Sequence, residues 1–439
     1  MTMGWFFSTS VTSNADIAAL RDVFQARRMR QRVSVDDTVA SIINTVRTDG
    51  DAALRTLTRQ FDCPEFETIR VPQGAIRLAR QRIAGTPLES ALVAARERIA
   101  QFHQAHRRYS WLDDSVPGER LGQRIIPYGH VGIYVPGGRA AYPSTVLMTA
   151  VPAKVAGVGR IIMCTPPQAE TGLPPDGTLA AAHIAGVDEV YAIGGAQAIA
   201  AMAYSTETVP QVDKIVGPGN AYVNAAKRMV YGDVGIDMLA GPSEVAVVVD
   251  EMSDLSGAAR ELIAQTEHDP MNAALLVASS TELVARINAE LESQLATLPR
   301  ADIVRASLAQ QSVVVACSNR DLMVDIVDTF APEHLHLDVV DAWEMAHVVR
   351  NAGAILVGKH TSAAHGDYVA GPSHTLPTAG AARFSSPLNV DDFTKKSSVL
   401  WLDESVSRKL APLAEAIATY EGLEGHARSA RGGHGGETT

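Results

Sequence analysis

Histidine, acidic and carboxamide side chains are the residues of this sequence that could bind a metal. Gln265 and His268 stand three apart in ELIAQTEHDP, so both would leave the same face of a helix and could converge on one ion. Asp367 and His374 lie in a segment rich in Gly, Ser and Pro, and His426 follows EGLEG near the end of the chain. Together these donors predict a mononuclear metal site with nitrogen and oxygen ligands; scattered surface side chains are the alternative.

Glu333 and His334 are candidates for acid and base chemistry. They occur in FAPEHLHL, where a helix is expected to end at Pro332 and a strand to begin. Catalytic side chains often project from such ends of elements, although a solvated turn would explain the same pair.

Glycine-rich turns between expected strands and helices could hold a nucleotide. They are YVPGG (134–138), IGGAQ (193–197) and VGPGN (216–220). Each would place main-chain N–H groups at a helix N-terminus, where a pyrophosphate or a nicotinamide amide could bind. None has the G-x-G-x-x-G pattern, and a sharp turn explains any one of them alone. Three in one domain favour a nucleotide site.

The three cysteines, Cys63, Cys164 and Cys317, show no C-x-x-C spacing and no activating partner. They indicate buried structural thiols in a reducing compartment, so we expect a cytoplasmic protein. The first residues lack a basic segment followed by a long apolar run, and no later segment reaches the ~20 apolar residues of a membrane helix. We therefore expect neither export nor insertion into a membrane.

The elements that must position these residues belong to a large globular protein. The chain has 439 residues, of which 46% are hydrophobic and 20% charged, so a disordered or collagen-like chain is excluded. This length suggests two or three domains. With 38 Lys and Arg against 49 Asp and Glu, the net charge is −11, which repels phosphate backbones, and nucleic-acid binding is not expected.

Hydrophobic patterning predicts helices first and parallel sheets afterwards. Residues 16 to about 110 show apolar positions three and four apart, which is typical of amphipathic helices. From residue 128, short apolar runs alternate with Ala-rich stretches: 131–135, 160–164, 189–193 and 214–216. After the Gly-Pro-Ser turn at 241–243 a second series follows: 244–249, 273–278, 312–317, 335–340 and 354–358. We predict an α/β fold with two Rossmann-like parallel-sheet domains plus helical N- and C-terminal arms.

At this level of detail the sequence resembles the histidinol dehydrogenases. The resemblance runs from about Val35 to His426 and rests on VGIYVPGGRAAYPSTVLMTAVPAKVAGV, VDKIVGPGNAYVNAAKRMVYGDVGIDMLAGPSEV, QTEHDP, FAPEHL, GDYVAGPSHTLPT and EGLEGH. As a group these motifs are highly specific.

The resemblance implies a zinc-dependent oxidoreductase of histidine biosynthesis that oxidises L-histidinol through histidinal to L-histidine with NAD. It implies the catalytic pair Glu333 and His334, and the metal ligands Gln265, His268, Asp367 and His426. NAD would contact Tyr134, Gln197 and Asn220. Besides His334 and the four metal ligands, the substrate would contact Ser243, His374 and Glu421.

The resemblance also implies a homodimer in which the C-terminal arm enters the neighbour's site. We accordingly expect a helical N-terminal arm (1–30), a discontinuous α/β domain for substrate and metal (31–128 and 244–386) and an NAD domain (129–243). A dimerisation arm (387–429) and a flexible tail (430–439) would follow.

Elementary chemistry fits these roles. Zinc accepts imidazole nitrogen and carboxamide or carboxylate oxygen, and a site without thiolate stays open to substrate atoms. An imidazole such as His334 can take the alcohol proton as hydride leaves, and the carboxylate of Glu333 can activate the water that attacks the aldehyde.

Several residues depart from the commonest form of the family: His336, Arg139, Ser373 and the glycine-rich tail. They lie beside the expected site, so they bear on substrate identity more than on reaction class. Two alternatives stay open: a paralogue that oxidises another small polar primary alcohol, such as a sulfonated diol, and a relative that binds metal or nucleotide without catalysis. The glycine turn YVPGGRAAYP favours histidinol as substrate.

Overall fold

A computed structural model describes residues 4–30, 35–137 and 141–432 of the chain. Its first part is a six-stranded parallel sheet with the order β1-β11-β10-β9-β12-β13. The strands are β1 (Phe7–Ser10), β9 (Glu244–Val249), β10 (Ala273–Ala278), β11 (Val313–Ala316), β12 (His334–Asp338) and β13 (Ala354–Val357). Every residue of β9 and β10 is buried, as expected for central strands of a sheet covered by helices on both faces.

The second part is a five-stranded parallel sheet with the order β6-β5-β4-β7-β8. Its strands are β4 (His130–Tyr134), β5 (Arg160–Cys164), β6 (Glu189–Tyr191), β7 (Lys214–Val216) and β8 (Gly235–Ile236). The helices that follow these strands are α5 (Pro143–Ala156), α6 (Asp176–Ala185), α7 (Gly195–Tyr204) and α8 (Ala221–Val230). The predicted alternation of strands and helices and the α/β fold class are therefore confirmed.

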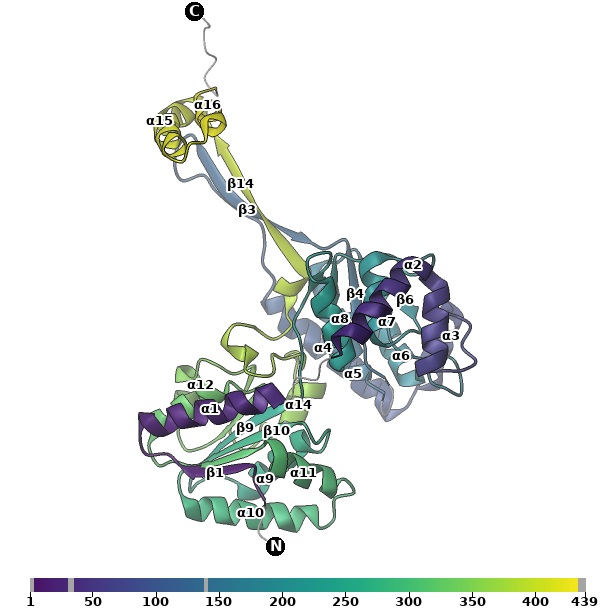
Figure 1. Cartoon of the computed structure of the whole chain (residues 1–439), viewed down its shortest axis with the longest axis vertical. Helices are drawn as coiled ribbons and strands as arrows, with labels where there is room; N and C mark the ends of the chain where they lie inside the picture. Colours follow the sequence, from purple (N-terminus) through teal and green to yellow (C-terminus); the bar gives the residue numbers. More distant parts are fainter. Residues whose placement is uncertain (1–3, 31–34, 138–140, 433–439) are drawn as a thin grey trace, which may run out of the picture.

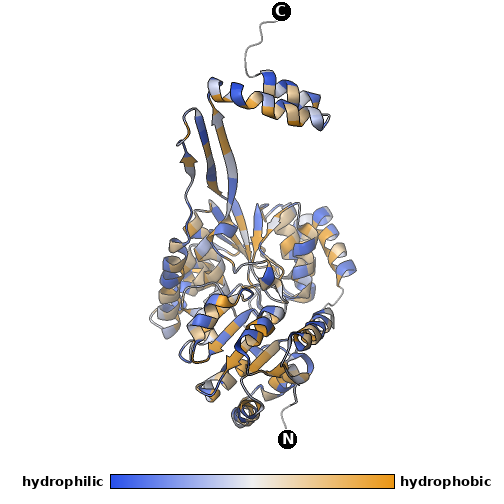
Figure 2. Cartoon of the chain, turned by 90° about the vertical axis from the view of Figure 1, so that its left-hand side faces the viewer, coloured by the Kyte–Doolittle hydropathy of each residue, from blue (hydrophilic) through white to orange (hydrophobic). Residues whose placement is uncertain are grey.

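An arm stands apart from these two parts (Figures 1 and 2). Its stem is an antiparallel ribbon of β3 (Glu119–Pro127) and β14 (Thr394–Leu402), with β2 (Trp111–Asp113) beside β3. Beyond the ribbon lie α15 (Glu404–Tyr420) and α16 (Glu424–Gly432), which pack on each other. The predicted helical C-terminal arm thus consists of two helices on a ribbon that the sequence pattern does not predict.

The N-terminal segment is part of the six-stranded domain. We expected a helical arm, but residues 7–10 form the edge strand β1, which pairs with β11. The following helix, α1 (Asn14–Arg30), buries Leu20 and Phe24, and the Phe24 ring meets Phe330 edge to face at 5.0 Å. Phe330 is the last residue of α12 (Arg320–Phe330). Helix α1 therefore packs on the same face of the six-stranded sheet as α12.

The helices between residues 36 and 105 pack on the five-stranded sheet. They are α2 (Asp36–Phe61), α3 (Gln73–Arg82) and α4 (Pro87–Ala105), and they contact α7, α6 and α5. Their buried residues share one hydrophobic core with β4 to β7. This differs from the expected grouping of 31–128 with 244–386, because an amphipathic stripe shows that a helix face is buried and not which sheet covers it.

The remaining helices surround the six-stranded sheet or the loops at its edge. They are α9 (Leu255–Thr266), α10 (Thr281–Leu295), α11 (Ala301–Gln311), α13 (Ala342–Val348) and α14 (Ala363–Tyr368), with 3₁₀ turns at Ala381–Arg383 and Val390–Phe393. No helix in the described part of the chain is both long and apolar enough to span a bilayer.

Candidate active site between the two sheets

The predicted site residues lie at opposite ends of the strands in the two sheets. Glu333 and His334 stand at the amino end of β12, and Ser243 directly precedes β9. Tyr134, in contrast, ends β4, at the carboxyl edge of the five-stranded sheet. The two edges meet where the Thr145 hydroxyl, in the first turn of α5, donates to His374 Nε2 at 3.2 Å. A site at this junction can take a nucleotide from one sheet and a substrate from the other.

A sharp end to α12 places the Glu333–His334 pair. Ala331 adopts a left-handed backbone (φ 51°) and its N–H caps the helix, so the chain turns directly into β12. The Glu333 carboxylate accepts a hydrogen bond from the main-chain N–H of Glu244 at 3.0 Å, and His334 Nε2 donates to Asp367 Oδ1 at 3.2 Å. Both side chains are buried, which rules out the solvated-turn interpretation.

The surroundings of this pair raise the pKa of both groups. Burial raises the pKa of Glu333 to about 7, although the charge of His334 and the Glu244 N–H oppose the shift. Burial lowers the pKa of His334, but the hydrogen bond to Asp367 and the charges of Glu333 and Asp367 outweigh it, so the net shift is upward. The carboxyl group of Glu333 can therefore gain and lose a proton near pH 7.

Asp367 links two imidazoles through its two kinds of oxygen. Its carboxylate binds His334, and its main-chain oxygen accepts a hydrogen bond from His374 Nδ1 at 2.8 Å. Burial raises the pKa of Asp367, but the hydrogen bond from His334 and the charges of His334, His374 and His268 outweigh it and lower the pKa overall. Asp367 is thus held as a carboxylate, the form that ligates a metal.

Gln265 lies in helix α9, and His268, whose charge acts on Asp367, follows the end of that helix. Gln265 is buried in the last turn, and its main-chain oxygen accepts a hydrogen bond from Asn272 Nδ2 at 2.7 Å. One turn earlier, the Glu261 carboxylate accepts from the N–H of Ala363 at 2.9 Å, which ties α9 to the start of α14. The helix ends at Thr266, so His268 lies exposed just beyond it rather than on the same helical face.

The structure does not bring His426 or Glu421 to these residues. Glu421 caps α15 and His426 lies in α16, both exposed at the far end of the arm (Figure 1). Within the described residues of one chain, no three His, Cys, Asp or Glu side chains are grouped to hold a metal. Gln265, His268 and Asp367 carry oxygen and nitrogen donors of the kinds that zinc accepts.

The residues expected to bind NAD lie along the carboxyl edge of the five-stranded sheet. Gly195, with φ +63°, turns the chain into α7 and donates its N–H to the Tyr134 hydroxyl at 3.1 Å. The buried Gln197 folds back over Gly195, since a Cβ there would lie 2.7 Å from Gln197 Oε1. Asn220 is exposed, and its side-chain oxygen caps α8 by accepting from the N–H groups of Tyr222 and Val223.

A cavity of about 290 Å³ opens beside His334 and Asp367. Apolar side chains line most of it, and His103 of α4 and His106, which follows the helix, also line it. These two histidines were not among the predicted site residues, because nothing in a helical stretch of the sequence indicates which side chains face a distant loop. A larger open hollow of about 670 Å³ lies at the amino edge of the five-stranded sheet, around His130 and Asp213, away from every predicted site residue.

The residues that depart from the commonest family pattern have structural partners or lie outside the description. His336 is buried in β12, and its Nε2 donates to the main-chain oxygen of Gly358 at 3.3 Å. The buried Ser373 hydroxyl accepts from the N–H of Thr375 at 3.1 Å. Arg139 and residues 433–439 of the tail lie outside the described residues.

Comparison with known proteins identifies the family. The family model for histidinol dehydrogenase matches residues 25–432. A histidinol dehydrogenase of Psychrobacter arcticus is 48% identical, with 90% of this chain and 92% of the relative covered. One from Halalkalibacterium halodurans is 44% identical over 95% and 97%. The crystal structure of histidinol dehydrogenase from Elizabethkingia anophelis superposes with a TM-score of 0.90 at 30% identity, covering 97% of both chains.

The fold, the junction of the two sheets and these relatives define an NAD-dependent dehydrogenase. More specifically, the chain belongs to the histidinol dehydrogenase family, as its sequence indicates.

Proposed function

We propose that this enzyme oxidises L-histidinol through histidinal to L-histidine, the last chemistry of histidine biosynthesis, with NAD as the hydride acceptor. The observation that carries the proposal is the buried pair Glu333 and His334 at the junction of the two sheets, beside Asp367. Oxidation of an alcohol to a carboxylate removes two hydrides and adds one water. Two NAD are therefore consumed, and proton acceptors are needed at both stages.

We propose that His334 takes the proton of the alcohol. Its Nε2 donates to Asp367, so the neutral imidazole keeps its lone pair on Nδ1. That nitrogen is buried and has no hydrogen-bond partner among the described residues. As hydride leaves the substrate carbon for NAD, the hydroxyl proton can pass to Nδ1, and the raised pKa of His334 favours its acceptance.

We propose that Glu333 activates water for the second oxidation. Its pKa of about 7 leaves much of the carboxyl group ionised near neutral pH, and the ionised form can take a proton from the attacking water. Addition of that water to the aldehyde carbon gives a hydrate, from which a second hydride passes to a second NAD. All three cysteines are buried and free, and none is among the site residues, so a thioester route has no support.

We further propose that zinc is held by Gln265, His268 and Asp367 and by His426 of the partner subunit. When bound, zinc supplies a Lewis acid that polarises the substrate oxygen. Ser243, His374 and the partner subunit's Glu421 would complete the substrate contacts, together with His334 and the metal ligands. Of these residues, His334 and Asp367 line the cavity of about 290 Å³.

The arm supports the proposed homodimer. Leu413 and Ile417, each 63% exposed, and Tyr420, 94% exposed, follow one another at helical spacing on α15. Leu400 and Trp401 on β14 add exposed apolar surface to the same arm. Such a surface at the end of a projecting arm fits burial against a second copy of the chain. The same docking would bring His426 to a site that lacks one ligand.

For NAD, we propose contacts with Tyr134, Gln197 and Asn220 at the glycine turns of the five-stranded sheet. Burial raises the pKa of Tyr134 to about 12, so it stays a neutral phenol that can donate a hydrogen bond. The three buried free cysteines support a reducing, cytoplasmic location.

Steady-state NADH formation tests the proposal. L-Histidinol should be turned over far faster than a sulfonated diol such as 2,3-dihydroxypropane-1-sulfonate. His334→Asn should slow turnover by roughly 10²–10⁴-fold, whereas the matched control His347→Asn, at an exposed position of α13, should not. Preference for the sulfonated diol would assign the enzyme to a paralogous reaction, and no turnover of any alcohol would indicate a binding protein.

A further inference from the structure

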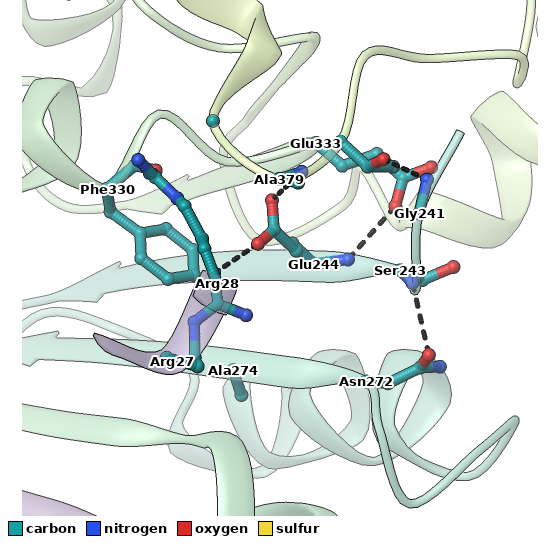
Figure 3. Close-up of polar contacts among 12 residues, drawn as sticks. Arg27, Arg28, Gly241, Ser243, Glu244, Asn272, Ala274, Phe330, Glu333 and Ala379 are labelled. Carbon is teal, nitrogen blue, oxygen red and sulfur yellow. Dashed lines mark hydrogen bonds and ion pairs between the residues drawn. The ribbon is translucent and has the colours of Figure 1, made fainter. Parts of the chain in front are cut away.

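A buried ion pair joins the N-terminal helix to the catalytic edge of the six-stranded sheet (Figure 3). The Arg27 side chain on α1 is 0% exposed, and its Nη2 binds Glu244 Oε1. Its Nε and Nη1 have no hydrogen-bond partner in the part of the chain that the structure describes. The guanidinium lies 5.0 Å from the centre of the Phe330 ring. Arg27 is thus committed to one carboxylate.

Glu244 in turn contacts the catalytic Glu333. As the first residue of β9, Glu244 donates its main-chain N–H to Glu333 Oε2 at 3.0 Å. Its own carboxylate accepts from the N–H of Ala379 at 2.9 Å as well as from Arg27. One residue therefore connects α1, the loop at 379 and the group proposed to activate water (Figure 3).

The same edge carries the neighbouring substrate and metal residues. The N–H of Ser243, next to Glu244, donates to Asn272 Oδ1 at 3.1 Å, and Asn272 Nδ2 donates to the main-chain oxygen of Gln265. The N–H of Gly241 donates to the Thr378 hydroxyl. A displacement of Glu244 is therefore expected to displace its chain neighbours Ser243 and Gly241 as well.

The charge of Arg27 matters beyond the attachment of α1, because it lies beside a pair of carboxylates. Two buried carboxylates, Glu244 and Glu333, lie close together, and the charge of Glu244 disfavours ionisation of Glu333. The other charged groups that act on Glu333 are His334, which favours its ionisation, and Asp367, which opposes it. Arg28 also faces Glu244, but its Nη2 donates to the main-chain oxygen of Phe330 at 2.6 Å, and Arg383 lies near it. Arg27 is the group paired directly with Glu244.

We propose that Arg27 is a positioning residue for Glu333, acting through Glu244: its charge neutralises the Glu244 carboxylate and holds the Glu244 N–H against Glu333. The inference rests on the proposed function of Glu333 as water activator. A merely structural ion pair would affect folding stability and leave the proton chemistry of Glu333 unchanged.

The test is a set of three variants, Arg27→Met, Glu244→Gln and the double variant, with kcat measured against pH. Arg27→Met leaves Glu244 unneutralised, so the acidic limb of the profile should move up by roughly one pH unit. Glu244→Gln removes the like charge, and the limb should move down. The double variant restores neutrality, so its limb should return close to that of the wild type.

Rescue and control variants separate charge from bulk. Arg27→Lys keeps the charge and should restore most of the wild-type limb. Arg305→Met removes an arginine paired with Glu292 on the outside of the same domain and should leave the limb in place. If Arg27→Met does not fold, the comparison of Glu244→Gln with the double variant decides, because only the latter lacks an unpaired buried charge.

An infrared pH titration provides a readout that is independent of turnover. The C=O band of the protonated Glu333 carboxyl, assigned by its loss in Glu333→Gln, should shift its midpoint in the same directions. If the acidic limb of the kcat profile and the infrared midpoint of Glu333 are unchanged in all three variants, and the wild type is active, the inference is overturned. Absence of histidinol turnover in the wild type would instead refute the proposed function.

Discussion

Replacing Glu333 by Gln should stabilise the folded protein above neutral pH while it impairs turnover. The pKa of Glu333 rises from 4.5 to about 7 in the folded protein because the carboxyl group is buried. At ~1.4 kcal/mol per pKa unit, the ionised carboxylate costs up to about 3 kcal/mol of folding free energy. Glutamine fills the same space without charge, so the cost disappears.

The direction in which stability changes with pH follows from the protons bound by the folded and the unfolded protein. Between pH 4.5 and about 7 the folded protein holds a proton on Glu333 that the unfolded chain has released. Stability from this group is therefore full below pH 4.5 and falls until about pH 7. The amide oxygen is a weaker acceptor for the Glu244 N–H than a carboxylate, which reduces the gain by ~1 kcal/mol. We expect a net gain of about 2 kcal/mol at pH 8 and none at pH 4.5.

Thermal unfolding at pH 4.5 and at pH 8, with matched zinc content, measures the effect. The variant should melt a few degrees above the wild type at pH 8 and no higher than the wild type at pH 4.5. Glu97→Gln, at an exposed position of α4, controls for the loss of one carboxylate. An equal difference in melting temperature at both pH values would show that burial does not disfavour the Glu333 charge, and the reasoning would fail.

Three further predictions concern the metal, the dimer and the division of labour. Dialysis against a chelator should abolish activity and zinc should restore it; full activity of the metal-free protein would refute the ligand set. Mixing His334→Ala with His426→Ala under conditions of subunit exchange should restore partial activity. One site of each heterodimer then carries neither defect. No recovery despite exchange would place His426 in its own subunit's site. Glu333→Gln should impair oxidation of supplied histidinal more than that of histidinol, and His334→Asn should slow the alcohol step by roughly 10²–10⁴-fold. Equal losses in both half-reactions for both variants would show that Glu333 and His334 act together in both steps.

The core strands were predictable because their sequences are continuous apolar runs. β9 and β10 read EVAVVV and AALLVA, and both strands occur where the sequence predicts them. β1, with the sequence FSTS, and the ribbon strands β3 and β14 are partly exposed and largely polar, so no such signal marks them. Their formation depends on pairing with strands far along the chain, which periodicity does not encode.

The sequence indicates which residues are candidates for the site but not how they are arranged. The sequence shows Glu333 and His334 at the start of a strand, and the structure adds that Asp367 holds His334. The contribution of Arg27 and Glu244 was not visible, because an arginine in an amphipathic helix is normally solvated and a glutamate at the start of a strand is unremarkable in sequence. Only the packing of α1 on the sheet makes this pair buried.

The ratio of NADH to L-histidine formed tests most directly the proposal that Glu333 and His334 carry out both oxidations in one site. With L-histidinol limiting and NAD in excess, NADH and the amino acid product are quantified together. Oxidation by Glu333 and His334 within one site predicts two NADH and one L-histidine per histidinol, without accumulation of free histidinal. One NADH per histidinol with release of the aldehyde, or no NADH at all, would contradict the account.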